Sequence, residues 1–387
     1  MKYYIIAGEA SGDLHGSNLM RGIYAHDKEA DIRFWGGEKM DGVYKEQQNG
    51  KGLVRDYRDT AVMGYVEVLL KGAKIARNVK ECKEDIESWK PDAVILIDYP
   101  GFNLKIAEFA HNKGFKVFYY IAPKVWASRE GRIKKIKAWV DRLFIIFPFE
   151  VPYFQSKEIP FTYVGNPLID AIKDSPAMQE NRNEFLQRTG LPDVPWIALL
   201  AGSRKMETDS MLPTYMAFAD VWHADNPDCQ FVIAAAPGRS MDDYLKHISG
   251  RPYVKVVFGE TYGILRHSQA AIVNSGTASL EAALIGTPQI VSYKVNPITA
   301  AIARRIVKVK YASLANLILD RPAVKELLQE DFTLENLVAE MRRITEDSTY
   351  RQKMLADYSE IKEKLGGEGA YLVAGGSIVK STSEATP

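Results

Sequence analysis

The sequence predicts an α/β protein with two Rossmann-like, doubly wound parallel-sheet domains that face a cleft. Apolar runs of strand length alternate with longer helical patterns through most of the 387 residues. The runs are almost continuously apolar, which is typical of parallel strands buried on both faces. The alternation pauses at residues 162–179, where Gly165, Pro167 and Pro176 precede a polar stretch, and then starts again. We therefore expect an interdomain linker there.

The first domain is expected to cover residues 1–170. Its apolar runs are rich in β-branched and aromatic residues, and each ends at Gly, Pro or a polar turn. They predict strands at residues 3–7, 32–35, 93–98, 116–121 and 143–147, with helices between them, for example at residues 102–113 and 129–140.

The second domain is expected to cover residues 171–387. It repeats the alternation, with predicted strands at residues 196–200, 230–236, 254–258, 271–274 and 289–293. The pattern is wholly helical over residues 334–365, so we expect a helical C-terminal region. The tail after Gly366 is rich in small residues, and we expect it to be loosely held.

The composition excludes several classes of protein. A formal net charge of +1 gives no overall field that would attract nucleic acid. Cys82 and Cys229 lie far apart and form no CxxC pair, which argues against a disulfide framework or zinc site and favours a reducing cytosol. The first apolar run is too short for a signal peptide, and no run reaches the length of a membrane-spanning helix.

The first candidate motif is GEASGD, residues 8–13, which joins a predicted strand to a helix. Gly8 and Gly12 permit a tight turn, and a helix N-terminus offers free N–H groups to an anion or a sugar hydroxyl. The spacing is not that of a dinucleotide fingerprint. The motif is either an ordinary turn with Ser11 or Asp13 as N-cap, or a ligand-binding loop.

The second motif is DYPGFN, residues 98–103, directly after a predicted strand. A carboxylate at the carboxyl end of a strand lies where open α/β sheets bind ligands. Apolar neighbours raise the pKa of such a carboxyl, so Asp98 is a candidate general base. Capping of the next helix is the alternative, but Pro100 and Gly101 separate Asp98 from its start near Phe102.

The third and fourth motifs belong to the second domain. The third motif is Gly202, Ser203 and Arg204, which follows a predicted strand. It combines backbone N–H groups with a guanidinium, which suits a diphosphate. A solvated surface arginine is the alternative.

The fourth motif is NSGTASLEAA, residues 274–283, which joins another strand to a helix. In it Ser275, Gly276 and Thr277 surround free N–H groups, and Glu281 lies one turn further along. Glu281 could accept hydrogen bonds from ribose hydroxyls. Alternatively, it is simply an acidic residue that the helix dipole favours in the first turns.

Metal-dependent sugar transferases commonly use a DxD pair, and this chain has none. Its six histidines show no HxH or HxxxH spacing, so we expect no metal site. Residues 63–83, 129–137 and 298–310 combine basic side chains with apolar ones. Such segments suit an anionic bilayer or an acyl substrate, although an ordinary amphipathic helix packed on its sheet is the alternative.

The ordered set of motifs resembles the lipid-A-disaccharide synthase family. The set comprises GEASGD, IDYPGFN, YYIAPKVWA, FPFE, YVGNP, GSR, NSGTASLEAAL, NLI and ELLQ. It runs from Gly8 to about Gln329, across both predicted domains. The family is similar to other inverting transferases of the GT-B fold, so the resemblance implies that fold, with its two domains around a cleft.

The resemblance also implies a reaction. UDP-2,3-diacylglucosamine gives its sugar to the 6-hydroxyl of 2,3-diacylglucosamine 1-phosphate (lipid X), and a β-1,6 disaccharide 1-phosphate and UDP result, without a metal or other cofactor. The family works in the cytoplasm, at the anionic surface of the inner membrane of Gram-negative bacteria. A homodimer is compatible with this, and no nucleic acid partner is implied.

On this resemblance the catalytic candidates are Glu9, Asp98 and Arg204. The UDP-sugar would meet two sets of residues, and the acceptor a third. The first donor set is Gly202, Ser203 and Arg204, and the second is Ser275, Gly276, Thr277, Glu281, Asn316 and Gln329. The acceptor set is Ser11, Gly12, Asp13 and Asn103. A UDP-N-acetylglucosamine 2-epimerase of the same fold and an inactive nucleotide- or lipid-binding protein are the alternatives.

The chain departs from the usual family pattern at several loops. Ala201, Ala315 and Lys325 stand where the family usually has proline, and Ser128 stands where a second tryptophan is common. Residues 369–380 lack the usual arginine–alanine pattern. The loss of a proline makes a loop less rigid but removes no catalytic group. We therefore expect these departures to affect loop rigidity and C-terminal packing rather than the reaction.

Overall fold

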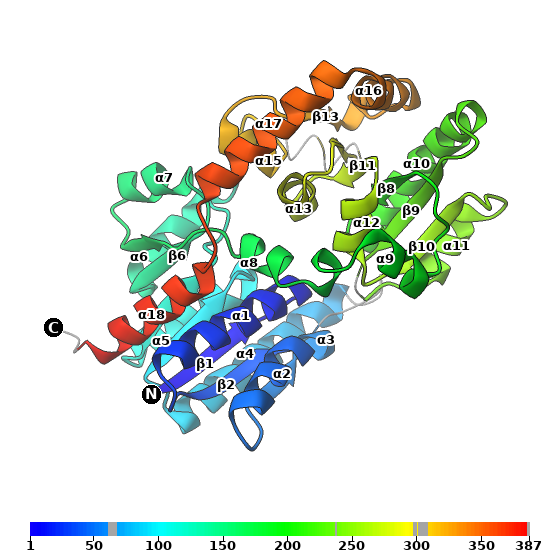
Figure 1. The fold of residues 1–387 in the computed structure, drawn as a ribbon. Helices are drawn as coiled ribbons and strands as arrows, with labels where there is room; N and C mark the ends of the chain where they lie inside the picture. The colour runs from blue at the N-terminus through cyan, green and yellow to red at the C-terminus, as the bar shows by residue number, and fades with distance from the viewer. Residues whose placement is uncertain (61–67, 237, 297–299, 301–308, 385–387) are drawn as a thin grey trace. The chain divides into compact units, whose positions relative to one another are not determined.

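The computed structural model describes residues 1–60, 68–236, 238–296, 300 and 309–384. The chain divides into two compact units (Figure 1). Unit 1 comprises Met1–Ala171 and Leu365–Pro387, and unit 2 comprises Ile172–Lys364. Each unit is built around one parallel sheet, which confirms the prediction of two Rossmann-like domains.

Unit 1 has a seven-stranded sheet with the order β3-β2-β1-β4-β5-β6-β7. All of its pairings are parallel, and β1 pairs with both β2 and β4. The strands are β1 (Lys2–Ala7), β2 (Asp31–Gly36), β3 (Leu53–Asp56), β4 (Ala93–Ile97), β5 (Lys116–Tyr120), β6 (Arg142–Ile145) and β7 (Phe161–Tyr163). The central strand β4 is buried along its whole length, as its continuous apolar run predicts.

Two layers of helices cover this sheet. In one, α1 (Ala10–His26) packs against α2 (Glu38–Gln47) and α18 (Ala370–Ser383). In the other, α4 (Val68–Trp89) packs against α5 (Pro100–Asn112), which also contacts α6 (Ile133–Trp139). The short helices are α3 (Tyr57–Thr60), α7 (Glu150–Ser156) and α8 (Pro167–Lys173).

Unit 2 has a six-stranded parallel sheet with the order β10-β9-β8-β11-β12-β13. Its strands are β8 (Trp196–Leu200), β9 (Gln230–Ala235), β10 (Val254–Phe258), β11 (Ala270–Asn274), β12 (Gln289–Tyr293) and β13 (Lys325–Leu328). Its helices are α9 (Arg182–Thr189), α10 (Lys205–Asp225), α11 (Asp242–Ile248), α12 (Thr261–His267), α13 (Thr277–Ile285), α15 (Leu314–Leu319), α16 (Leu334–Glu346) and α17 (Ser348–Leu365).

Each sheet reverses its strand order once. In unit 1 the reversal falls between β1 and β4, and in unit 2 between β8 and β11. The helices that follow the two strands at such a point lead away to opposite faces and leave a crevice at the carboxyl ends, where this class of sheet binds ligands. The four motifs from the sequence follow these four strands.

The C-terminal tail differs from the expectation. Residues after Gly366 were expected to be loosely held in the second domain, but they form α18 and belong to unit 1. The Asp170 carboxylate accepts hydrogen bonds from the backbone N–H groups of Gly369 (2.6 Å) and Ala370 (3.0 Å) and so caps this helix. Figure 1 shows α18 beside α1. A Cβ on Gly375 would lie 2.3 Å from the carbonyl carbon of Gly22, so the glycines permit a close helix crossing.

Candidate active site

The turns after β1 and β4 touch each other at the switch point of unit 1. A Cβ on Gly8 would lie 2.3 Å from the ring of Tyr99, so the absence of a side chain at position 8 permits the contact. Gly8 precedes Glu9, and Tyr99 follows Asp98. The structure thus brings the GEASGD and DYPGFN motifs together, as the strand order requires.

Asp98 lies in a constrained turn. Its φ of +41° and that of Tyr99, +46°, are both left-handed, a conformation that side chains other than Gly, Asn and Asp rarely adopt. Two hydrogen bonds to the backbone carbonyl of Asp98 stabilise the turn. The Tyr119 hydroxyl donates to this oxygen at 2.5 Å, and the Asn103 amide donates to it at 2.8 Å. Backbone strain of this kind is found mainly where a side chain must be presented in one direction.

The Asp98 carboxyl is half-buried, and its environment changes its acidity. Burial raises its pKa above the ordinary value, while the nearby positive charges of Lys124 and Arg132 limit that rise. A carboxylate with a raised pKa is a better proton acceptor than an ordinary aspartate. Lys124 and Arg132 were given no role at this site from the sequence, although Lys124 belongs to the matched motif YYIAPKVWA and Arg132 to the basic segment 129–137.

The side chains of Asn103 and Asp13 form hydrogen bonds to backbone groups of the turns and of α2. The Asn103 amide nitrogen donates to the carbonyls of Ile97 (3.1 Å) and Asp98, and the residue is fully buried. The Asp13 carboxylate accepts three backbone N–H groups at the start of α2, including Gly37 N at 2.7 Å. Both side chains thus stabilise the two turns in this structure, while the Asn103 Oδ1 has no hydrogen-bond partner among the described residues. Their contact with the acceptor stays a prediction.

The other residues of GEASGD lie at the start of α1. Glu9 is its N-cap residue, and the Asp13 N–H donates to Glu9 O at 2.9 Å to close the first turn. Neither Ser11 nor Asp13 is the N-cap, because Asp13 caps α2 instead. Gly12 is buried, and a Cβ there would lie 3.2 Å from that of Ala7, whereas Glu9 and Ser11 are exposed.

In unit 2 the turns after β8 and β11 also touch. Gly202 has a φ of +100°, and a Cβ on it would lie 2.4 Å from the Asn274 amide nitrogen. The GSR and NSGT motifs therefore lie side by side at the second switch point, as the sequence predicts for neighbouring strand ends. Asn274 is buried, and its Oδ1 has no hydrogen-bond partner among the described residues.

A glutamate that the sequence did not single out fixes the first of these turns. Glu207 Oε2 accepts the N–H groups of Ser203 (3.1 Å) and Arg204 (3.3 Å) in the first turn of α10. The Arg204 side chain is 75% exposed and contacts Glu207 Oε1 at 3.5 Å. An exposed ion pair of this kind contributes little stability, so the guanidinium loses little free energy when it leaves Glu207 to bind an anion.

The start of α13 offers backbone N–H groups. Gly276 has a φ of +147°, and Thr277 begins the helix and is exposed. Within the described parts of the chain, the N–H groups of Gly276 and Thr277 have no protein acceptor, as at any uncapped helix start. The Ser275 hydroxyl donates to Ala312 O at 2.9 Å, so it retains only acceptor capacity.

Glu281 lies one turn into α13 and is half-buried. The Tyr262 hydroxyl of α12 donates to its Oε1 at 3.1 Å. Burial raises the pKa of the Glu281 carboxyl, and the Tyr262 hydrogen bond opposes that rise. Tyr262 is a further residue that motif matching missed, since it comes from a different helix.

Asn316 and Gln329 were expected to line the donor site, and in the structure both amides form hydrogen bonds to neighbouring residues. The Asn316 amide makes four hydrogen bonds: its nitrogen donates to Val324 O and Glu326, and its oxygen accepts Ala323 N and Val324 N. This fills its capacity, so its side chain is not left for a ligand. The Gln329 amide faces the backbone N–H and carbonyl of Val295 at 3.3 and 3.1 Å.

Comparison with known proteins agrees with these motifs. Residues 3–373 match the family described as lipid-A-disaccharide synthetase. The lipid-A-disaccharide synthase of Trichlorobacter lovleyi is 36% identical over 95% of this chain and 94% of its own, and that of Syntrophus aciditrophicus is 38% identical over the same shares. The chain belongs to the lipid-A-disaccharide synthase family. This makes it a transferase of the glycosyltransferase class.

Solved structures extend the comparison of the fold. The UDP-GlcNAc 2-epimerase of Neisseria meningitidis, solved with UDP-GlcNAc, has a TM-score of 0.70 and covers 98% of this chain and 99% of its own, at 14% identity. The Staphylococcus aureus MnaA structure with UDP has a TM-score of 0.67 at 13% identity. At these identities the likeness shows the fold alone.

Two of the basic segments lie partly outside the described residues. For residues 63–83 the side chains are described from Lys74 onward, and for residues 298–310 from Val309 onward, apart from Ala300. In the described residues of this family member, no helix is both long and apolar enough to cross a membrane. No cluster of three or more His, Cys, Asp or Glu side chains suited to a metal occurs among those residues either.

Proposed function

We propose that this family member transfers 2,3-diacylglucosamine from its UDP derivative to the 6-hydroxyl of 2,3-diacylglucosamine 1-phosphate. The products are the β-1,6 disaccharide 1-phosphate and UDP. The observation that carries the proposal is the family match over residues 3–373, together with relatives named lipid-A-disaccharide synthase that are 33–38% identical over nearly the whole chain.

The acceptor is activated in unit 1. Asp98 takes the proton from the 6-hydroxyl as its oxygen attacks the anomeric carbon of the donor, so inversion needs one displacement and no covalent intermediate. The raised pKa and half-burial of Asp98 support this role. Glu9, exposed at the start of α1, is the second carboxylate at the same switch point.

The leaving diphosphate is stabilised in unit 2. Arg204 supplies a guanidinium, and the N-terminus of α13 supplies the N–H groups of Gly276 and Thr277. The contact between Gly202 and Asn274 supports their joint action, because it brings the two turns together. Glu281 accepts the ribose hydroxyls with the oxygen that Tyr262 does not occupy.

The test is release of UDP by the purified chain from UDP-2,3-diacylglucosamine, with and without the acylated acceptor phosphate. We expect release only when both substrates are present, and a disaccharide 1-phosphate by mass spectrometry. No release with both substrates would refute the proposal. Arg204→Ala should reduce turnover, while Arg342→Ala, which removes another exposed arginine of unit 2, should leave it unchanged.

A UDP-N-acetylglucosamine 2-epimerase is the second candidate, since the fold likeness favours it. Such an enzyme would convert non-acylated UDP-N-acetylglucosamine without an acceptor. Proton exchange at C2 of that sugar in deuterated water separates the two functions. We expect no exchange, because the family match concerns the transferase.

The acylated substrates reside in a bilayer, so we propose peripheral binding to an anionic membrane surface. Support comes from the basic side of α4, where Arg77 and Lys80 are exposed. Reversing the charges of Lys71, Lys74 and Arg77 should release the protein from vesicles that contain an anionic lipid. Unchanged sedimentation with those vesicles would remove this part of the proposal.

A further inference from the structure

Three basic side chains gather on the loop that follows β5, beside the Asp98 turn. We call Lys124, Arg129 and Arg132 the cationic cluster. Their loop starts next to the catalytic candidate, because the Asp98 N–H donates to Tyr120 O at 3.3 Å and so pairs the end of β4 with the end of β5. The charges of Lys124 and Arg132 act on the Asp98 carboxyl, and the charge of Arg129 acts on Arg132. The cluster therefore lies at the carboxyl end of β5, within unit 1.

The cationic cluster has no counter-charge among the residues that the structure describes. Neither a salt bridge nor a hydrogen bond joins any of its three side chains to another of those residues. The acidic residue of the same loop, Glu130, accepts a hydrogen bond from Lys157 Nζ at 2.7 Å instead. Arg132 is half-buried, and both its burial and the charge of Arg129 lower its pKa, so its charged form is destabilised there. A bound anion would remove this cost, because it supplies the partner that a buried charge otherwise lacks.

A buried glutamate fixes the loop that carries the cationic cluster. Glu150 Oε1 accepts the Trp126 indole N–H at 2.9 Å, and its Oε2 accepts the backbone N–H groups of Ile146 and Phe147, each at 3.0 Å. The Trp126 ring also packs edge-on against Phe149, with 4.8 Å between ring centroids. These contacts join the loop after β5 to the turn after β6. A loop that is already ordered loses less conformational entropy when it binds a ligand.

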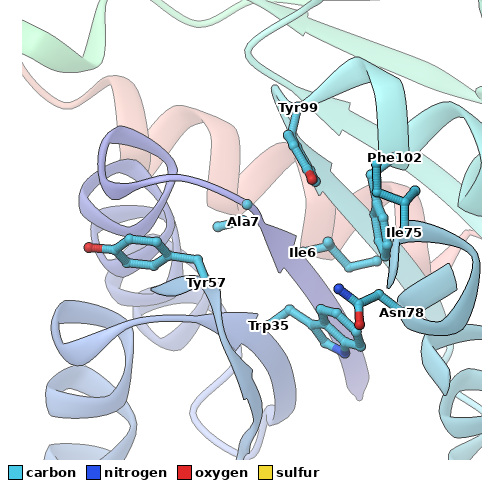
Figure 2. A pocket seen from close by; sticks show the side chains of 9 residues that line it. Ile6, Ala7, Trp35, Tyr57, Ile75, Asn78, Tyr99 and Phe102 are labelled. Carbon is cyan, nitrogen blue, oxygen red and sulfur yellow. The ribbon is translucent and has the colours of Figure 1, made fainter. Parts of the chain in front are cut away.

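The β1 side of the Asp98 turn has a different chemistry. There the Tyr99 ring contacts Gly8 and stacks on Phe102, with 5.6 Å between ring centroids. Figure 2 shows both rings on the wall of a pocket whose lining residues carry no charged side chain. Burial and the Glu9 carboxylate raise the pKa of Tyr99, so the charge that acts on this side is negative. An anion is therefore attracted to the β5 side of the turn and not to the β1 side.

We infer that the cationic cluster binds the phosphate monoester of the acceptor. The inference rests on the proposed function, which supplies an acceptor with a 1-phosphate. Such a monoester carries about −1.5 to −2 charges at pH 7 and has three strongly accepting oxygens. A guanidinium fork from Arg132 and an ammonium from Lys124 suit these oxygens. A phosphate held beside Asp98 fixes one end of the acceptor sugar, which limits the orientations of the 6-hydroxyl relative to the base.

Two acceptors that differ only in the phosphate test this inference. In non-ionic detergent micelles, calorimetry should show that the wild type binds 2,3-diacylglucosamine 1-phosphate about 10- to 100-fold more tightly than 2,3-diacylglucosamine. Arg132→Gln should reduce this preference about tenfold and leave the Kd of the unphosphorylated acceptor within about twofold. Arg142→Gln is the matched control. Arg142 is also half-buried, but it lies at the amino end of β6, where its guanidinium donates to Thr162 Oγ1 at 3.4 Å, so its loss should leave the preference unchanged.

Lys124→Gln is the second variant, and it should reduce the same preference about threefold to tenfold. An unchanged preference in both variants would overturn the inference, as would an equal weakening of both acceptors in Arg132→Gln, which would indicate a structural role. Weakening that occurs only on vesicles with an anionic lipid, and not in micelles, would assign the cationic cluster to lipid headgroups and overturn it too. Failure of the wild type to release UDP would instead refute the proposed function. The binding assay needs no turnover, so the two failures are distinguishable.

Discussion

Replacing Asp98 with asparagine separates the chemical role of this carboxylate from its place in the fold. Position 98 has a φ of +41°. Asparagine is among the few residues that adopt this conformation readily, so the turn should keep its shape, whereas alanine would add strain. The hydrogen bonds from Tyr119 and Asn103 end on the backbone carbonyl, which the substitution leaves in place.

The rate should fall by the contribution of a general base, about 10²- to 10⁴-fold in kcat. That loss corresponds to about 3–5 kcal/mol of activation free energy. Stability should not fall with it. Because burial raises the folded-state pKa of Asp98, its ionised form costs stability as pH rises above the ordinary aspartate pKa. The neutral asparagine removes that cost, so we expect equal or higher stability at pH 7.

The assay is UDP release with both acylated substrates, paired with urea unfolding of each variant. Asp92→Asn is the matched control. Asp92 lies just before the opposite end of β4, is exposed, and accepts a hydrogen bond from Lys2 N at 2.8 Å. The Asp92→Asn substitution removes the same charge at a position away from the switch point, so kcat should be unchanged.

The pH profile of the wild type adds a second readout. The acid limb of kcat/KM should lie above the ordinary aspartate pKa, since burial raises the pKa of Asp98. A kcat for Asp98→Asn within threefold of the wild type would refute its assignment as the base. An equal loss in Asp92→Asn would show that the rate responds to net charge rather than to position.

Three further predictions concern binding and stability. Glu281→Gln should weaken UDP binding about 10- to 100-fold by calorimetry and leave thermal stability intact, because its amide oxygen still accepts from Tyr262 and no charge remains buried. Burial raises the pKa of Glu150 from 4.5 to about 7, so the thermal midpoint should fall as the pH rises from 4.5 to about 7, and Glu150→Gln should flatten that slope. Gly375→Ala should lower the free energy of unfolding by about 1–3 kcal/mol in urea, since its Cβ would meet Gly22, and unchanged stability would contradict the close crossing.

The sheet strands that the sequence predicted best are five residues long and mostly apolar. The bounds of β8, β10 and β12 match the expectation, and β4 differs only at Asp98. The sequence missed β3, β7 and β13, which have three or four residues each and lie at sheet edges. These three edge strands are too short and too exposed to carry a clear apolar run, whereas the edge strand β10, VKVVF, keeps one that only Lys255 interrupts.

The C-terminal helix shows a different limit. Its composition, AYLVAGGSIVKSTS, contains two adjacent glycines and no helical apolar stripe strong enough to predict it. It forms because Asp170 caps its start and because Gly375 permits contact with α1. Both are contacts between residues far apart in the chain, which local patterns do not reveal. Tyr262 was missed for the same reason, because its hydrogen-bond partner Glu281 lies on another helix.

A carboxylate in a strand-end turn has two possible uses, and the number of N–H donors within reach decides between them. Asp13 and Asp98 both belong to matched motifs at the same switch point of unit 1. Asp13 is buried and accepts three N–H groups from the start of α2, which satisfies its charge inside the protein. Among the described residues, the Asp98 carboxylate has the Tyr99 N–H and the charges of Lys124 and Arg132 but no comparable set of donors, and burial raises its pKa. A carboxylate with fewer hydrogen-bond donors and a raised pKa is better suited to take a proton from substrate, and that difference favours Asp98 over Asp13 as the base.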